Sequence, residues 1–257
     1  MSDHIKHYWE KQGETYKNSH EASWGDKFAI DLEIKNISKF IQSGDNVLDI
    51  GCANGYSTFF YLKKNPNHIT GIDYARNMIE HANESVKTLN VGAKIEFQVG
   101  DIKELDFDDS TFDISYTTRV LINLPTWEEQ KLGIDEAIRV TKKGGKIIFS
   151  EGFYEPLVLL NAMRQLVHLE PLVEHDFNRY IKKTFLEDYL NKKGFKFNCV
   201  DMTSIYYLGS RFLRELVTNP SDYPGYSNPI NKLFYDIEEK FSGGGFGIQQ
   251  LYVIDKP

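Results

Sequence analysis

The stretch Val47-Leu48-Asp49-Ile50-Gly51-Cys52-Ala53-Asn54-Gly55 decides the fold of this chain. Its apolar half, residues 47–50, has the length of a buried strand and ends at a turn with small residues at 51, 53 and 55. A helical pattern follows at once, to about residue 64. Small residues at such a turn let a ligand approach the backbone, and the first N–H groups of the helix face that ligand. The stretch therefore predicts a ligand site at the carboxyl end of a strand.

The spacing of this turn distinguishes it from a dinucleotide-binding turn. A pyrophosphate site favours Gly-x-Gly-x-x-Gly, whereas this chain has Gly-x-Ala-x-Gly with Asp49 two residues before the first glycine. A carboxylate does nothing for a bound anion, but it attracts a ligand that carries an ammonium or sulfonium group. An NAD-dependent oxidoreductase is therefore disfavoured.

Strand and helix patterns alternate on both sides of this stretch. The patterns are a helix at 26–41, strands at 69–72, 94–99, 112–116 and 146–150, and helices at 75–89 and 126–140. The turn Lys143-Gly144-Gly145 precedes the last of these strands. Such alternation predicts a parallel sheet whose strand carboxyl ends all meet at one edge.

The chain after residue 150 departs from this alternation. Its expected elements are a Leu-rich helical segment at 154–183, a helix at 184–193, a strand at 195–203, an irregular stretch at 204–247 and a strand at 249–254.

We expect one domain over residues 1–257, with its core at 26–153. The segments 1–25, 154–183 and 204–247 would cap this core, and the two C-terminal strands would join its sheet. The expected fold class is α/β, a Rossmann-like, doubly wound and mostly parallel sheet with helical and loop caps.

Composition restricts the partners. The net charge is −7 and the basic residues are scattered among carboxylates, so we expect no nucleic-acid partner. No apolar run approaches the roughly 20 residues of a membrane span, and the N-terminus shows no signal-peptide pattern. Two cysteines, Cys52 and Cys199, are too few for a disulfide framework or a cysteine metal site, and we expect no metal. A cytoplasmic monomer or homodimer without a membrane partner is predicted.

Two further acids stand at predicted strand ends. Asp73 lies in Gly71-Ile72-Asp73-Tyr74, and Asp101 lies in Val99-Gly100-Asp101-Ile102. A carboxylate in the position of Asp73 can accept hydrogen bonds from both hydroxyls of a ribose. Asp101 can accept one from an exocyclic amine.

Together these motifs resemble the class I S-adenosylmethionine-dependent methyltransferases, in particular the small-molecule branch often called type 11. The resemblance covers roughly residues 30–150 and the two C-terminal strands. It implies a seven-stranded sheet with the last strand antiparallel, S-adenosylmethionine as cofactor and S-adenosylhomocysteine as product. It also implies that the first motif holds the methionine part, Asp73 the ribose, and Asp101 with the Ile102 backbone the adenine.

The expected cofactor-binding residues include an aromatic lid from the N-terminal segment. They are Tyr16, Trp24, Asp49, Gly51, Cys52, Ala53, Gly55, Asp73, Tyr74, Met78, Gly100, Asp101, Ile102 and Thr117. Tyr16 and Trp24 are equally compatible with core or surface aromatics. Ala53 stands where the family usually has glycine, and its methyl group is a small change if φ is negative there.

Catalytic and acceptor residues are marked less clearly. Arg119 and Asn123 follow the fourth strand and would face the acceptor, although Arg119 can equally pair with a carboxylate. His168 and His175 are candidate general bases, because the histidine pKa lies near neutrality. The candidates for acceptor contacts are Glu151, Tyr206 and Arg211.

We predict a methyltransferase whose partner is a small polar acceptor, with O-methylation of a sugar-like or phosphorylated compound first. N-methylation of a small amine is the alternative. A non-catalytic protein that binds S-adenosylmethionine is a second class, and a turnover assay separates it from an enzyme.

Overall fold

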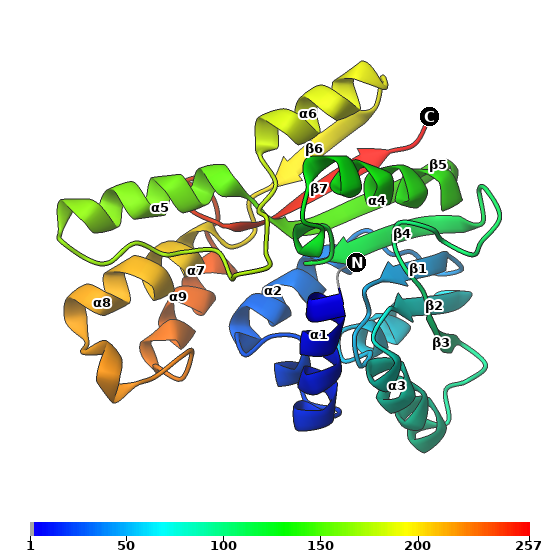
Figure 1. Cartoon of the computed structure of the whole chain (residues 1–257), viewed down its shortest axis with the longest axis horizontal. Helices are drawn as coiled ribbons and strands as arrows, with labels where there is room; N and C mark the ends of the chain where they lie inside the picture. The colour runs from blue at the N-terminus through cyan, green and yellow to red at the C-terminus, as the bar shows by residue number, and fades with distance from the viewer. Residues whose placement is uncertain (1–2) are drawn as a thin grey trace.

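A seven-stranded sheet lies between layers of helices in the computed structural model, which describes residues 3–257 (Figure 1). The strands are β1 (Asn46–Ile50), β2 (His68–Asp73), β3 (Ile95–Val99), β4 (Phe112–Thr118), β5 (Thr141–Gly152), β6 (Lys196–Val200) and β7 (Gln249–Asp255). Their order is β3-β2-β1-β4-β5-β7-β6. β7 pairs antiparallel with β5 and β6, and the other neighbours pair parallel. The predicted Rossmann-like sheet is confirmed.

The helices follow the predicted alternation through the core. They are α1 (Asp3–Tyr16), α2 (Lys27–Ile37), α3 (Arg76–Leu89), α4 (Trp127–Val140), α5 (Tyr154–Leu166), α6 (Lys183–Lys192), α7 (Ser204–Leu208), α8 (Arg214–Val217) and α9 (Ile230–Glu238). A 3-10 helix, η2 (Thr58–Lys64), replaces the α-helix expected after Gly55, and a π-helix, η4 (Gly209–Leu213), joins α7 to α8. Among residues 3–257 no helix has the length and apolar character of a membrane span.

Polar side chains set the ends of the core helices. Asp26 is the N-cap of α2 and accepts a hydrogen bond from the backbone N–H of Ala29, at 3.2 Å. Thr126 caps α4 in the same way through the N–H of Glu129, at 3.2 Å. α3 ends at Asn90, which has a left-handed φ of 54°. These are the residue types that such positions favour.

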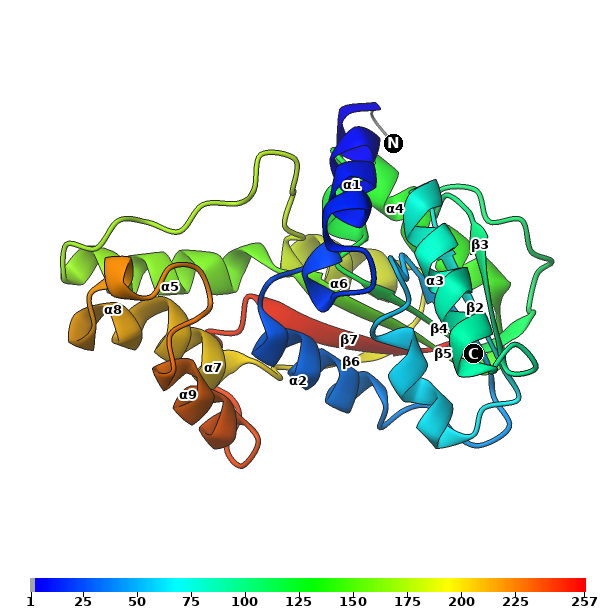
Figure 2. The ribbon, with the colours of Figure 1, turned by 90° about the horizontal axis from the view of Figure 1, so that it is seen from below.

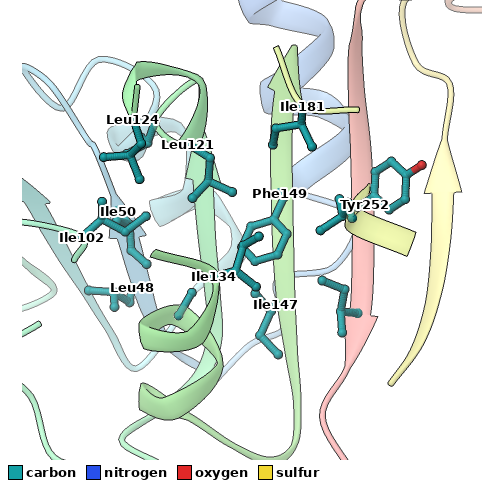
Figure 3. Close-up of a cluster of buried hydrophobic side chains, with 14 of the residues drawn as sticks. Leu48, Ile50, Ile102, Leu121, Leu124, Ile134, Ile147, Phe149, Ile181 and Tyr252 are labelled. Atoms are coloured by element: carbon teal, nitrogen blue, oxygen red, sulfur yellow. The ribbon is translucent and has the colours of Figure 1, made fainter. Parts of the chain in front are cut away.

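The two faces of the sheet are packed separately. On one face, Ile134 of α4 and Phe149 of β5 belong to one buried cluster (Figure 3). Leu186 of α6 is part of the same cluster. On the other face, Ile34 of α2 and Ile79 of α3 belong to a second buried cluster. The sheet is therefore covered on both sides, as a parallel sheet requires.

The cap helices α5, α7, α8 and α9 lie together at one end of the sheet (Figures 1 and 2). Their buried cluster contains Leu160, Tyr206 and Phe234, and it continues onto Ala29 and Leu32 of α2. Because α5 begins two residues after β5 ends, this cap stands at the carboxyl end of β5.

The caps differ from their sequence interpretation. Residues 204–247, expected to be irregular, contain α7, η4, α8 and α9, whereas the expected helical segment 154–183 is helical only over α5 and continues as a loop to α6. The helices of residues 204–238 depend on tertiary packing, since a Cβ at Gly209 would lie 2.0 Å from the ring of Phe234. The turn Lys143-Gly144-Gly145 lies inside β5, near an irregularity in its pairing with β4.

Glu151 lies near the carboxyl end of β5, one residue beyond the last pair with β4, and is fully buried. Its carboxylate accepts a hydrogen bond from the Thr117 hydroxyl at 2.7 Å. It also accepts three from the backbone N–H groups of Val120, Leu121 and Ile122, at 3.0 to 3.3 Å. Burial raises the pKa of Glu151 to about 7 in spite of these donors. The expectation that Glu151 faces an acceptor therefore differs from the structure, because four internal donors hold its carboxylate.

We expect Glu151→Gln to destabilise the protein by about 1–3 kcal/mol. The side-chain NH₂ group of glutamine would point at one of the four donors that now bond to the carboxylate. Urea unfolding measures this change. Glu128→Gln is the matched control: the Glu128 side chain is 77% exposed, so its effect should stay within about 0.5 kcal/mol. Equal stabilities of the two variants would contradict the structural role of Glu151.

Candidate functional site

A first cavity opens at the carboxyl ends of β1, β2 and β4. The expected cofactor residues on its wall are Asp49, Gly51, Cys52, Ala53, Asp73, Tyr74 and Met78. Arg119 and Asn123, which follow β4, complete the wall from the opposite side. The structure thus brings the first and second motifs together at the sheet edge where they were predicted to meet.

The turn after β1 is shaped by close contact with the chain after β4. Gly51 has a φ of 79°, and a Cβ there would lie 2.1 Å from Cγ2 of Val120, so only glycine fits. Its N–H and that of Cys52 both donate to the carbonyl of Ile72, at 2.7 and 2.9 Å. The turn is therefore hydrogen-bonded to β2 and packed against the chain that follows β4.

Ala53 adopts a left-handed φ of 48°, which differs from the negative φ under which alanine is a small change. A left-handed φ costs an L-residue about 1–2 kcal/mol, which explains why glycine is usual there. The N–H of Ala53 donates to the Asp73 carboxylate at 3.0 Å, and this bond holds the turn in place.

Two carboxylates of the first cavity have perturbed acidity. Burial raises the pKa of Asp49 to about 6, and its carboxylate accepts a hydrogen bond from the Thr58 hydroxyl at 2.6 Å. Burial also raises the pKa of Asp73 to about 6, although it accepts bonds from the N–H groups of Ala53 and Ala75. Both groups therefore change charge just below neutral pH.

A second cavity, of about 550 Å³, adjoins the first. Its aromatic wall consists of Tyr8, Trp9, Trp24, Phe177, Tyr180, Tyr207 and Tyr226. Its charged and titratable residues are Arg119, Glu174, His175, Asp176 and Arg211. Four residues, Trp9, Ser23, Arg119 and Asn123, line both cavities and form what we call the shared wall.

Arg119 of the shared wall both lines the cavities and pairs with a carboxylate, the two roles that its place in the sequence left open. Its guanidinium forms an ion pair with Glu33, which is only 2% exposed, and lies 4.8 Å from the ring centroid of Trp24. Glu33 also accepts hydrogen bonds from Ser150 at 3.0 Å and Gln249 at 2.6 Å. Burial raises the pKa of Glu33, and the charge of Arg119 opposes this shift.

Arg211 occupies the other side of the second cavity and is paired in the same way. Its guanidinium binds the carboxylate of Asp26, which is fully buried and also accepts a hydrogen bond from the Tyr206 hydroxyl at 2.6 Å. The guanidinium stacks 4.7 and 4.8 Å from the ring centroids of Tyr207 and Tyr226. Tyr206 thus lies behind Arg211 and off the cavity wall, which differs from its expected contact with an acceptor.

Several other expected residues lie off both cavity walls. They are Tyr16, Gly55, Gly100, Asp101, Ile102, Thr117, Glu151 and His168.

Several of these placements have a local cause. Thr117 donates its hydroxyl to Glu151, and Ile102 is buried in the core. Gly55 is required by packing, since a Cβ there would lie 2.7 Å from the ring of Phe97. His168 is exposed just after α5, at a left-handed φ of 60°. It lies outside the cavity where a general base is needed, whereas His175 lies on the second cavity's wall.

The contribution of α1 to both cavities was not predicted from the sequence. Trp9 lines both cavities, and Tyr8 packs against Phe177 with ring centroids 4.8 Å apart. The signal was weak but present: Ile5 and Gly13, four residues on either side of Trp9, are buried on the same helix face.

Glu10 attaches α1 to α3. Its carboxylate accepts hydrogen bonds from the backbone N–H groups of Arg76 at 2.8 Å and Asn77 at 3.2 Å. These N–H groups belong to the first turn of α3, whose N-cap residue, Ala75, has no side-chain acceptor. Glu10 therefore serves as the cap of another helix and holds α1 beside the first cavity.

Comparisons with known proteins identify the domain. A family model described as a methyltransferase domain matches residues 47–145. The chain is 29% identical to 27-O-demethylrifamycin SV methyltransferase of Amycolatopsis mediterranei (strain S699), over 45% of this chain and 42% of the relative. It is 26% identical to phosphoethanolamine N-methyltransferase 1 of Arabidopsis thaliana, over 64% of this chain and 34% of the relative. It therefore spans less than half of the length of these relatives.

A solved structure shows the same fold over almost the whole chain. The PH0226 protein from Pyrococcus horikoshii OT3 has a TM-score of 0.60, 17% identity and 98% coverage of both chains.

The fold and the matched residues define a methyltransferase domain built on the core of the sheet. Residues 47–145 match the methyltransferase domain model, and the seven-stranded sheet with an antiparallel last strand is the one that the resemblance to class I S-adenosylmethionine-dependent methyltransferases implied.

We expect Glu10→Ala to loosen α1, because it leaves the first turn of α3 without its cap. Hydrogen exchange at residues 3–19 should accelerate, while the core strands should keep their protection. Glu14→Ala on the same helix is the control, since Glu14 is exposed. If both variants exchange like the wild type, Glu10 does not hold α1 in place.

Proposed function

We propose that this protein transfers a methyl group from S-adenosylmethionine to a small polar acceptor. The cofactor would occupy the first cavity and the acceptor the second. The shared wall carries this proposal, because a ligand in either cavity reaches Trp9, Ser23, Arg119 and Asn123. Two ligands that meet at one wall are oriented for a direct transfer, and orientation contributes roughly 7–11 kcal/mol to such reactions.

The residues of the first cavity fit the cofactor's chemistry. When bound, S-adenosylmethionine supplies a methyl group on a positively charged sulfur. The carboxylate of Asp49 is suited to its ammonium group, and that of Asp73 to its ribose hydroxyls. The N–H of Gly100 donates to the carbonyl of Asp73 at 3.0 Å, so Asp101, the next residue, follows β3 beside this end of the first cavity. This position supports the adenine end of the proposal at Asp101 and Ile102.

The proposal covers both oxygen and nitrogen acceptors. The name of the rifamycin relative supports the O-methylation that the sequence favours, and the phosphoethanolamine relative supports the N-methylation alternative. The aromatic and charged wall of the second cavity suits a small molecule with a polar group. Oligomeric state, cytoplasmic location and the absence of a nucleic-acid partner stay predictions.

Methyl-transfer activity is tested by S-adenosylhomocysteine release with a panel of small hydroxyl and amine compounds. Release that depends on an added acceptor supports an enzyme. Tight cofactor binding without release for any acceptor would favour the non-catalytic binding protein.

We expect S-adenosylhomocysteine affinity to fall as pH falls through about 6. Asp49 and Asp73 each have a pKa raised to about 6, and the ligand's donors prefer both carboxylates ionised. The logarithm of the association constant should thus approach a slope of about two per pH unit well below pH 6. Titration calorimetry between pH 5 and 8 measures it.

Asp49→Asn should remove one of these titrations and reduce the slope to about one. It should also weaken binding at pH 8 by about 1.5–3 kcal/mol, since a charged partner is lost. Asp109→Asn is the control, because the Asp109 side chain is 77% exposed. A wild-type affinity that stays constant from pH 5 to 8 would refute the assignment of both carboxylates.

A further inference from the structure

We infer that the acceptor is an amine that reacts as its neutral free base, with an N–H group donating to Oδ1 of Asn123. This inference rests on the proposed function, because it names the class of acceptor that the second cavity takes. It is carried by the composition of the shared wall and by the hydrogen bonds of Asn123.

The shared wall holds no group that removes a proton at neutral pH. Among the described residues it consists of Trp9, Ser23, Arg119 and Asn123. Indole and guanidinium groups only donate hydrogen bonds, and a carboxamide is neutral. The Ser23 hydroxyl donates to the carbonyl of His20 at 3.1 Å and has no basic partner there. A hydroxyl acceptor at this wall would therefore keep its proton.

The basic groups of the second cavity are not part of the shared wall. Glu174, His175 and Asp176 line only the second cavity, and Glu174 accepts a hydrogen bond from the backbone N–H of Tyr180. Burial raises the pKa of Tyr180 to about 12 and also raises that of Tyr8, so both phenols stay protonated. An acceptor that needs a base before it reacts therefore finds none on the shared wall, where the two cavities meet.

Asn123 of the shared wall has an unused acceptor atom. Its side chain is buried, with 5% of the residue exposed, and its Nδ2 donates to the carbonyl of Arg119 at 2.6 Å. A carbonyl accepts only, so this bond fixes which end of the amide is Oδ1. Within the described chain Oδ1 has no hydrogen-bond partner. A buried acceptor without a donor is unfavourable, and a donor from a ligand removes that cost.

An amine N–H is the donor that fits this atom and the reaction together. With one hydrogen donated to Oδ1, the nitrogen lone pair is free to form the new N–C bond. The bond between the methyl carbon and sulfur breaks at the same time, and its electron pair stays on sulfur. The nitrogen becomes a cationic ammonium and then loses its proton to water. No protein base is required before the attack.

The charges around the second cavity suit the ammonium that forms. Its guanidinium groups, Arg119 and Arg211, are each paired with a buried carboxylate, Glu33 and Asp26. Glu174 and Asp176 then add negative charge to the wall. Aromatic faces attract a cation further, so the product is stabilised without a free guanidinium to repel it.

Paired compounds test the inference directly. The wild-type protein is assayed by mass spectrometry with 2-phenylethylamine against 2-phenylethanol and with ethanolamine against ethylene glycol, within a wider library of amine and alcohol pairs. We expect methylated amines and no methylated alcohol oxygens. Below the acceptor's pKa, kcat/KM should rise about tenfold per pH unit, and a fluorinated amine of lower pKa should shift the profile to lower pH.

Two variants of Asn123 isolate its Oδ1. Asn123→Asp and Asn123→Leu both lose the bond to the Arg119 carbonyl, but only the aspartate keeps an oxygen acceptor. We expect leucine to lower kcat/KM for amines by at least about 100-fold and aspartate by less than about 10-fold. Calorimetry with the protein saturated by S-adenosylhomocysteine should show weaker amine binding in the leucine variant than in the aspartate variant. His168→Ala, off both cavities, should leave activity unchanged.

The outcomes separate this inference from the proposed function. Methylated alcohols, equal losses in the two Asn123 variants, or S-adenosylhomocysteine binding without turnover of any amine in the library would overturn the inference. A pH profile that disappears in His175→Ala, instead of following the acceptor's pKa, would overturn it too. Failure of the wild-type protein to bind S-adenosylhomocysteine would contradict the proposed function itself.

Discussion

The buried carboxylate of Glu151 fixes the chain that follows β4, and the arrangement of both cavities depends on it. Three consecutive N–H groups, from Val120 to Ile122, converge on this single side chain at the end of β5. Their convergence holds the backbone in a tight turn and sets the positions of Arg119 and Asn123 at its two ends. The same turn places Val120 against Gly51, so it also defines the turn after β1. One interaction thus connects the cofactor side with the acceptor side.

The buried charges around the two cavities are compensated by ion pairs. Arg119, with a left-handed φ of 57°, carries its guanidinium to Glu33, and Arg211 carries its own to Asp26. A buried charge without its partner would be costly, so each pair constrains the elements that supply it. Glu33 and Asp26 both belong to the region of α2, which explains why this helix lies between the sheet and the cap helices (Figure 2).

The cofactor side was largely predictable because its signals are local. Asp49, Gly51 and Asp73 stand at strand ends within short stretches whose periodicity identifies the strands. Asp101 was also predicted from its place at a strand end, yet it lies off the cavity wall. The direction of a side chain at a strand end depends on the loop that follows. The helix α1 escaped prediction for a different reason: its apolar face is narrow, and Glu10 and Trp9 contribute only once α3 and Phe177 are in place.

The acceptor side has no such local signal, because it is assembled from segments far apart in the sequence. Trp24 donates its indole N–H to the hydroxyl of Tyr226 at 3.1 Å, across 202 positions of the chain, and Arg211 reaches Asp26 across 185. Contacts of this kind depend on how the caps pack, and the spacing of residues in the sequence does not predict them. The strand ends that build the first cavity are part of the sheet and cannot change without changing the fold. The caps that build the second cavity pack on α2 at one end of the sheet, outside the strand ends that hold the cofactor, so their residues can vary while the cofactor site is kept.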